Sequence, residues 1–233
     1  MNKSIIQHLQ HLGQYLALGA MGWVSLSQTV VAGEPGEQGA APQITVYVYN
    51  WAEVEPSTLR EAKDVVTRIL SKAGVDATLL DAPPSSPAEN GQAETRLGRS
   101  NFFVQILSLP MAEGFGFPTQ VLGVAPGDPQ ELDRDQVYVL DPVAKRMAQE
   151  QVRARESRMV FMNATKGQIL GHGMAHEIGH VLLRQAAHPP AGLMRAQWNR
   201  TDFQDMVGGN LRFTSQEAAR LRAELHRRGF TAR

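Results

Sequence analysis

Apolar and polar residues alternate near the start of the folded part of the chain, which predicts β-strands. Residues 44–49 read Ile-Thr-Val-Tyr-Val-Tyr, a strand by residue type and by alternation. The apolar spacing then becomes helical from Pro56 to about Ala73, where Gly74 ends the helix. Ala77–Leu80 reads as a second short strand. Together these segments predict a βαβ unit.

Three more strands and a charged helix are predicted in the middle of the chain. Phe102–Leu109 is apolar on both faces, which is typical of a central strand. Thr119–Val124 and Gln136–Leu140 read as two further strands, and a charged helical pattern runs from Pro142 to about Ser157. Residues 83–100 are rich in Pro, Ser, Asn and Gly, so they predict an exposed loop.

Two helices are predicted in the last third, separated by a long irregular stretch. Lys166–Arg184 is the most apolar helical segment of the chain. The last helix begins after Thr214, with Glu217 three residues later in a capping-box arrangement.

The N-terminus has the features of a signal peptide spanning residues 1–32. Lys3 supplies a positive charge, Leu16–Leu26 is an uncharged and mostly apolar run, and Val30-Val31-Ala32 resembles a cleavage site. An uncleaved anchor or a membrane-facing helix is the alternative. We expect residues 33–43 to form a linker. We expect an exported protein, periplasmic or secreted, that has no stable membrane insertion after cleavage.

Composition narrows the chemistry of the remaining domain, residues 44–233. Lys+Arg and Asp+Glu number 23 each, so no net field favours nucleic acid as a partner. The 233-residue chain has no cysteine, which excludes disulfides and thiolate metal sites. Any metal ion must therefore be held by histidine and carboxylate side chains.

A candidate metal-binding motif lies in the apolar helix. The sequence His176-Glu177-Ile178-Gly179-His180 has the HExxH spacing. Residues four apart share one face of a helix, so His176 and His180 can bind a single ion. Glu177 neighbours that face and reaches water beside the ion without being a ligand. The motif predicts a Zn(2+) site with Glu177 as the catalytic base.

The sequence after this helix resembles the metzincin peptidases. It reads Arg-Gln-Ala-Ala-His-Pro-Pro-Ala-Gly-Leu-Met from Arg184 to Met194. Metzincins show HExxHxxGxxH followed by a tight turn with a Met beneath the metal. The resemblance implies that His188 is the third ligand and that Gly192-Leu193-Met194 is the Met-turn. The chain departs from the family because His188 lies eight residues after His180 instead of six, and Leu183 replaces the turning Gly.

Other assignments of the third ligand stay open. His188 is otherwise a solvated loop histidine, and a carboxylate then completes the site, as in peptidases of the gluzincin type. Glu217 is the natural carboxylate candidate, with Asp202 and Asp205 behind it.

Three further residues of this region have two interpretations each. His172 continues the stripe of His176 and His180 but lies too far along the helix to share the ion with both, so it supports the site or is an interior histidine. Arg195 either polarises a substrate carbonyl or caps a surface. Met194 is otherwise a core filler.

These observations predict an α+β domain of the zincin type. A twisted mixed sheet and the motif helix would form an upper lobe, residues 44–184, above a small C-terminal lobe, residues 185–233. In metzincin-like folds an edge strand binds an extended peptide, and Thr119–Val124 is the candidate for that strand.

The predicted function is zinc-dependent hydrolysis of peptide bonds, with metal-activated water and Glu177 as general base. We expect an endopeptidase acting on a peptide or protein substrate. The alternatives are a non-catalytic zinc-binding envelope protein and a structural module in which the motif is fortuitous.

Overall fold

The predicted strand–helix–strand unit is confirmed. Strands β1 (Gln43–Asn50) and β2 (Asp76–Asp81) are parallel neighbours joined by helix α2 (Pro56–Lys72). The side chain of Glu55 caps α2 by accepting hydrogen bonds from its first backbone N–H groups. The computed structural model describes four stretches of the chain: residues 41–82, 101–125, 135–156 and 163–230.

The strands form one mixed five-stranded sheet in the order β2-β1-β3-β5-β4. Strand β3 (Asn101–Leu107) lies in the centre and is parallel to both β1 and β5 (Gln136–Leu140). Strand β4 (Gly123–Val124) pairs antiparallel with β5 at the edge. The predicted strand over Thr119–Val124 is therefore correct in its last two residues and in its place at the edge, but residues 119–122 are not in a strand.

Six helices belong to the described residues. Helices α5 (Asp141–Glu156), α6 (Lys166–Leu183) and α8 (Ser215–Arg227) agree with the sequence-based predictions. Helices α4 (Leu109–Gly114) and α7 (Arg200–Gly208) were not predicted. Both are short, so a periodic apolar pattern has little length in which to appear.

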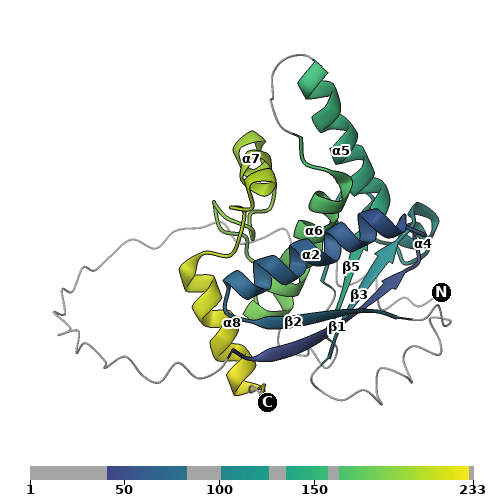
Figure 1. The fold of residues 1–233 in the computed structure, drawn as a ribbon. Coiled ribbons are helices and arrows are strands. Elements are labelled where there is room, and N and C mark those ends of the chain that lie inside the picture. Colours follow the sequence, from purple (N-terminus) through teal and green to yellow (C-terminus); the bar gives the residue numbers. More distant parts are fainter. Residues whose placement is uncertain (1–40, 83–100, 126–134, 157–162, 231–233) are drawn as a thin grey trace, which may run out of the picture. The chain divides into compact units, whose positions relative to one another are not determined.

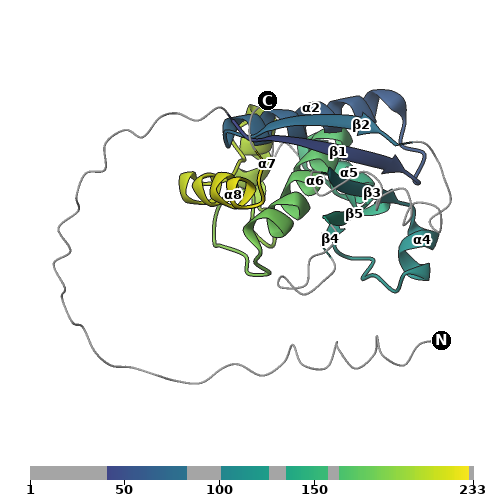
Figure 2. The ribbon, with the colours of Figure 1, turned by 90° about the horizontal axis from the view of Figure 1, so that it is seen from below.

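One cluster of buried apolar side chains joins the sheet, α2 and α6. Val46, Val104 and Val139 contribute from the strands, with Leu70 from α2 and Met174 from α6. Figure 1 shows α2 and α6 beside the sheet, and Figure 2 shows β4 at its margin. The α+β fold class with a mixed sheet is thus confirmed, and the sheet supports the helix that carries the candidate site.

The predicted signal peptide, residues 1–32, lies outside the described residues, as does the linker up to residue 40. The described residues all belong to one compact unit, residues 39–233. Within them, none of the helices combines the length and the apolar character that a membrane span needs.

Candidate metal centre

Helix α6 places three histidines in one stripe. Thr165 begins the helix through a reciprocal capping box with Gln168, as the two side chains exchange hydrogen bonds with each other's backbone N–H groups. His172, His176 and His180 then follow at intervals of four residues. Nearly the whole helix is buried, so polar groups on it need partners.

The structure brings His176, His180 and His188 together. The Nε2 atom of His180 lies 3.0 Å from Nε2 of His176 and 3.1 Å from Nε2 of His188. One nitrogen from each of the three residues lies within 4.8 Å of the others. Two nitrogens bound to one tetrahedral zinc ion at ~2.0–2.1 Å lie ~3.3 Å apart. The two pairs that include His180 are close to that spacing, and the third pair lies within 4.8 Å, so the three side chains are grouped closely enough to be candidate ligands of one metal ion.

For two of these histidines, a hydrogen bond at the other ring nitrogen fixes the tautomer. Nδ1 of His176 lies 2.8 Å from the Leu193 carbonyl oxygen, and Nδ1 of His180 lies 2.7 Å from the Gln185 carbonyl oxygen. A carbonyl accepts, so each Nδ1 carries the proton and donates. In the neutral rings both Nε2 atoms then present lone pairs 3.0 Å apart, which repel unless a cation lies between them. The site fits a metal ion.

The chain turns back toward α6 at Arg184. This residue has φ 49° and ψ 45°, the left-handed conformation, and it ends the helix directly after Leu183. The turning residue is therefore Arg184, one position after Leu183, which stands where the metzincin motif has its turning Gly. Because the helix runs further, the longer spacing from His180 to His188 still lets His188 reach the cluster. His188 is exposed, so the cluster opens to solvent.

A tight turn at residues 192–195 supports His176. The N–H of Arg195 donates to the carbonyl of Gly192 at 3.3 Å, and Gly192 has a φ of 82°. The Leu193 carbonyl inside this turn accepts from His176 and also from Nε1 of Trp198, at 3.2 Å. The turn thus orients the His176 ring through a backbone carbonyl.

Met194 in this turn is fully buried against α6. A Cβ atom placed on Gly179 would lie 2.5 Å from Met194 Sδ, so the sulfur occupies the space that a side chain would take. Gly179 lies between the two helical histidines in sequence. The sequence resemblance placed Met194 beneath the metal site, and the structure places it directly against the helix that carries His176 and His180.

Helix α8 supports His180 in the same indirect way. Arg220 donates to the Gln185 side chain at 2.9 Å and to the Leu183 carbonyl at 3.2 Å. It thereby holds the residue whose own carbonyl accepts from His180. Arginine at the end of a helix also complements the free carbonyls and the helix dipole.

Two of the carboxylates considered as third ligands, those of Glu217 and Asp202, have other partners. The Glu217 carboxylate accepts from the Thr214 backbone N–H at 2.8 Å and from its hydroxyl at 3.0 Å. Asp202 accepts from the Asn199 backbone N–H at 2.7 Å and forms an ion pair with Arg195 at 3.2 Å. Among the described residues, the cluster with metal-ligand spacing contains three histidines and none of Glu217, Asp202 and Asp205.

His172 and Arg195 have structural contacts that account for their positions. The His172 ring is buried, and its Nδ1 lies 2.7 Å from the Gln168 carbonyl of its own helix. It lies outside the cluster and packs edge-on against Trp198. Arg195 pairs with Asp202 in the first turn of α7. Both arrangements match the structural interpretations of these residues.

Glu177 follows the candidate ligand His176 on α6 and is buried, with 6% of its surface exposed. No residue in the described part of the chain donates a hydrogen bond to its carboxyl group. Burial raises the pKa of Glu177 to about 8, because an ionised carboxylate loses its hydration there. A nearby cation would favour the ionised form again.

The histidine pKa values move in the direction that metal binding requires. Burial lowers the pKa of His176 to about 4, and it also lowers the pKa of His180 and His188. Neutral imidazole is the form that binds a metal ion. The three rings are therefore in the uncharged form at neutral pH.

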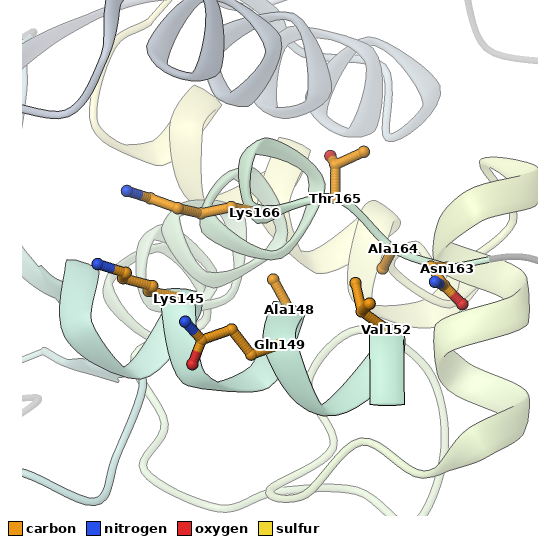
Figure 3. A pocket seen from close by; sticks show the side chains of 8 residues that line it. All are labelled: Lys145, Ala148, Gln149, Val152, Asn163, Ala164, Thr165 and Lys166. Atoms are coloured by element: carbon orange, nitrogen blue, oxygen red, sulfur yellow. The ribbon is translucent and has the colours of Figure 1, made fainter. Parts of the chain in front are cut away.

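A separate depression of about 300 Å³ lies between α5 and the beginning of α6. It is lined by side chains of α5 between Lys145 and Val152 and by the segment Asn163–Lys166 (Figure 3). None of His176, Glu177, His180 and His188 belongs to its lining, so it is not the metal centre.

Comparison with known proteins identifies no family for this chain. No protein-family model matches it, and no curated protein is significantly similar to it in sequence. Among solved structures, the chain is similar to metalloproteinase-II from Bacteroides fragilis, with a TM-score of 0.41 and 12% sequence identity. The match covers 82% of this chain, which spans about 55% of the length of that protein.

Several residues around the candidate site were not found from the sequence. Three groups support the histidines through backbone or indirect contacts: the carbonyl of Gln185, the indole of Trp198 and the guanidinium of Arg220. A carbonyl carries no signature in a sequence motif, because every residue has one. Leu193 was singled out as part of the Met-turn, but its bond to His176 was not predicted.

Proposed function

We propose that this protein is a zinc-dependent peptidase in which His176, His180 and His188 hold the metal ion. The observation that carries the proposal is the convergence of three Nε2 atoms, two of them on rings whose Nδ1 proton is committed to a carbonyl. Three histidine ligands leave a fourth position for water, which is the arrangement of catalytic rather than structural zinc sites.

Glu177 is the general base of this proposal. A zinc ion in the site would supply a Lewis acid that polarises the scissile carbonyl and makes water more acidic. Glu177 follows His176 on α6, about 100° further round the helix, a position from which its carboxylate can reach water held by such an ion. It accepts a proton from the attacking water and delivers that proton to the leaving amine as the C–N bond breaks.

An extended peptide is the substrate that suits this site. Strand β4 is the edge of the sheet, and it lies against α6 at Glu177. A peptide that pairs with this edge would lie beside the carboxylate. Strand pairing engages the middle of a chain, which favours an endopeptidase.

Export remains part of the proposal, on the basis of the signal-peptide features in residues 1–32.

The test combines bound metal with peptide hydrolysis, measured on the purified protein. We expect about one zinc per chain by elemental analysis, and cleavage of casein or of a peptide library. Glu177→Ala should keep the zinc and lose about 10²–10⁴-fold in kcat, the usual contribution of a general base. Cleavage by Glu177→Ala at the wild-type rate would exclude this mechanism.

The alternative of a non-catalytic zinc-binding protein predicts a different pattern. It would bind zinc with the same three histidines, yet neither the wild type nor Glu177→Ala would cleave any peptide of a broad library. The buried position of Glu177, with no partner for its carboxyl group in the described part of the chain, favours the enzyme. A structural role would leave such a costly group without a reason.

A further inference from the structure

Edge strand β4 lies directly on the Glu177 side chain. A Cβ atom added to Gly123 would lie 2.5 Å from Glu177 Cγ, 2.6 Å from its Oε1 and 2.8 Å from its Cδ. Carbon atoms in van der Waals contact lie about 3.5–4.0 Å apart. Any side chain at position 123 would therefore have to push Glu177 away.

The reason for glycine at this position is space and not backbone conformation. The residues of positive φ in the described chain include five glycines, and Gly123 is not one of them. Its backbone pairs in an ordinary antiparallel ladder with Val139 of β5. Alanine would thus be tolerated by the backbone, and its methyl group is what Glu177 would meet.

A second contact fixes how β4 lies along α6. The Leu122 side chain fills the notch at Gly173, where an added Cβ would lie 2.8 Å from Leu122 Cδ2. Gly173 precedes Glu177 by four residues, so the two positions share one face of the helix. The Leu122 carbonyl also accepts from the Leu140 backbone N–H at 2.8 Å. The strand is therefore held from both sides where it reaches Glu177.

We infer that Gly123 is a positioning residue for Glu177: its missing side chain lets the edge strand confine the carboxylate beside the three-histidine cluster. Among the described residues no hydrogen bond orients this carboxyl group, so packing against β4 has to do so. The consequence for catalysis rests on the proposed peptidase function. The same short strand then borders both the substrate and the base, and it sets their relative position.

Gly123→Ala in the full-length protein tests this inference, with Gly114→Ala as the matched control. Gly114 lies in α4, and an added Cβ there meets no atom within 4 Å. We expect Gly123→Ala to keep its zinc and its KM and to lose about 10–100-fold in kcat, because small misplacements of a catalytic group are costly. Gly114→Ala should match the wild type in all three quantities. An unchanged kcat in Gly123→Ala would overturn the inference.

A thermal double-mutant cycle with Glu177→Ala examines the contact without any assay of activity. Overpacking should lower the Tm of Gly123→Ala by about 2–8 °C in the wild-type background. In the Glu177→Ala background the new methyl group finds room, so the same substitution should cost little. A loss of Tm of equal size in both backgrounds would also overturn the inference.

The two experiments separate this inference from the proposed function. If the wild type cleaves no peptide but the thermal cycle shows coupling, the peptidase proposal fails and the packing of Gly123 on Glu177 stands. If the wild type cleaves peptides and Gly123→Ala does so equally well, the positioning inference fails and the peptidase proposal stands. Unfolding of Gly123→Ala that is rescued by Glu177→Ala would be the strongest form of the expected coupling.

Discussion

Helix α6 and the segment that follows it, residues 185–199, supply the candidate site in different ways. The helix is buried, regular and capped, and it brings His176 and His180 together through its own periodicity. The following segment has no helix or strand, and it brings His188 to the same point through a left-handed residue and a few hydrogen bonds. Two of the candidate ligands thus depend on secondary structure, and the third depends on individual contacts.

The two regions of the site are therefore vulnerable in different ways. The helical pair is protected by the core, because α6 packs against α2, the sheet and α8. Two carbonyl groups of the following segment, those of Gln185 and Leu193, bond to the helical histidines themselves. Each region therefore helps to hold the other in place, and substitutions in either region should weaken metal binding at the candidate site.

The largest expected effect comes from removing His188, the ligand candidate of the following segment. His188→Ala should weaken zinc binding at least about 100-fold, since even loss of a residue that supports a ligand costs about 10–100-fold. Competition with a chelator measures the affinity. Glu217→Gln is the control, and it should keep its zinc because Glu217 caps α8. The reverse result, with zinc lost in Glu217→Gln and kept in His188→Ala, would assign the third ligand to the carboxylate.

The next effect concerns His172, which continues the histidine stripe into the core. Burial lowers its pKa to about 4, well below the ordinary value near 6.5. The unfolded chain then binds more protons than the folded one between pH 6.5 and 4, so stability is present above pH 6.5 and is lost as the pH falls toward 4. The loss attributable to His172 should be about 2–3 kcal/mol at pH 4.5.

Denaturant titrations of the metal-free protein at pH 7 and pH 4.5 measure this effect. His172→Leu removes the titrating group, so its free energy of unfolding should depend less steeply on pH than that of the wild type. The other buried histidines titrate in both proteins and cancel in the comparison. Equal pH dependence in the two proteins would show that His172 is not held neutral by the fold.

A smaller effect is expected at Arg220, which connects α8 to the following segment. Arg220→Ala should weaken zinc binding about 10-fold, because Gln185 loses the contact that holds its carbonyl toward His180. Arg227→Ala is the matched control on the same helix, since Arg227 pairs with Glu224 and is exposed. If the two variants bind zinc equally well, α8 does not support the site.

The smallest effect concerns Arg184, where helix and segment meet. Its left-handed backbone is costly for any residue with a Cβ atom. Arg184→Gly should be more stable than Arg184→Ala by about 1 kcal/mol, as both lose the side chain and only glycine relieves the backbone. Thermal unfolding of the two variants side by side gives the difference. An alanine variant as stable as the glycine variant would show that the residue carries no such strain.

The sequence gives a good account of the elements that have long periodic patterns. The βαβ unit, the central β3, the helix α6 and the capping box of α8 were all predicted from apolar spacing and capping residues. Helix α7 was missed because its nine residues follow an irregular stretch, although Asn199 and Asp202 form a capping box there. Those two residues were the available signal.

From the amino-acid order alone, helical periodicity places His176 and His180 on one face of a helix with Glu177 beside them, because that relation is local. It also indicated His188 and the turn at Met194, through a resemblance and not through geometry. Only the folded structure shows that His188 reaches the other two rings, that backbone carbonyls fix the tautomers of His176 and His180, and that Gly123 lies on Glu177. Gly123 and Glu177 lie far apart in the chain, and even where the partners are closer, as for His176 and Leu193, no local pattern encodes which backbone groups will meet when the core packs.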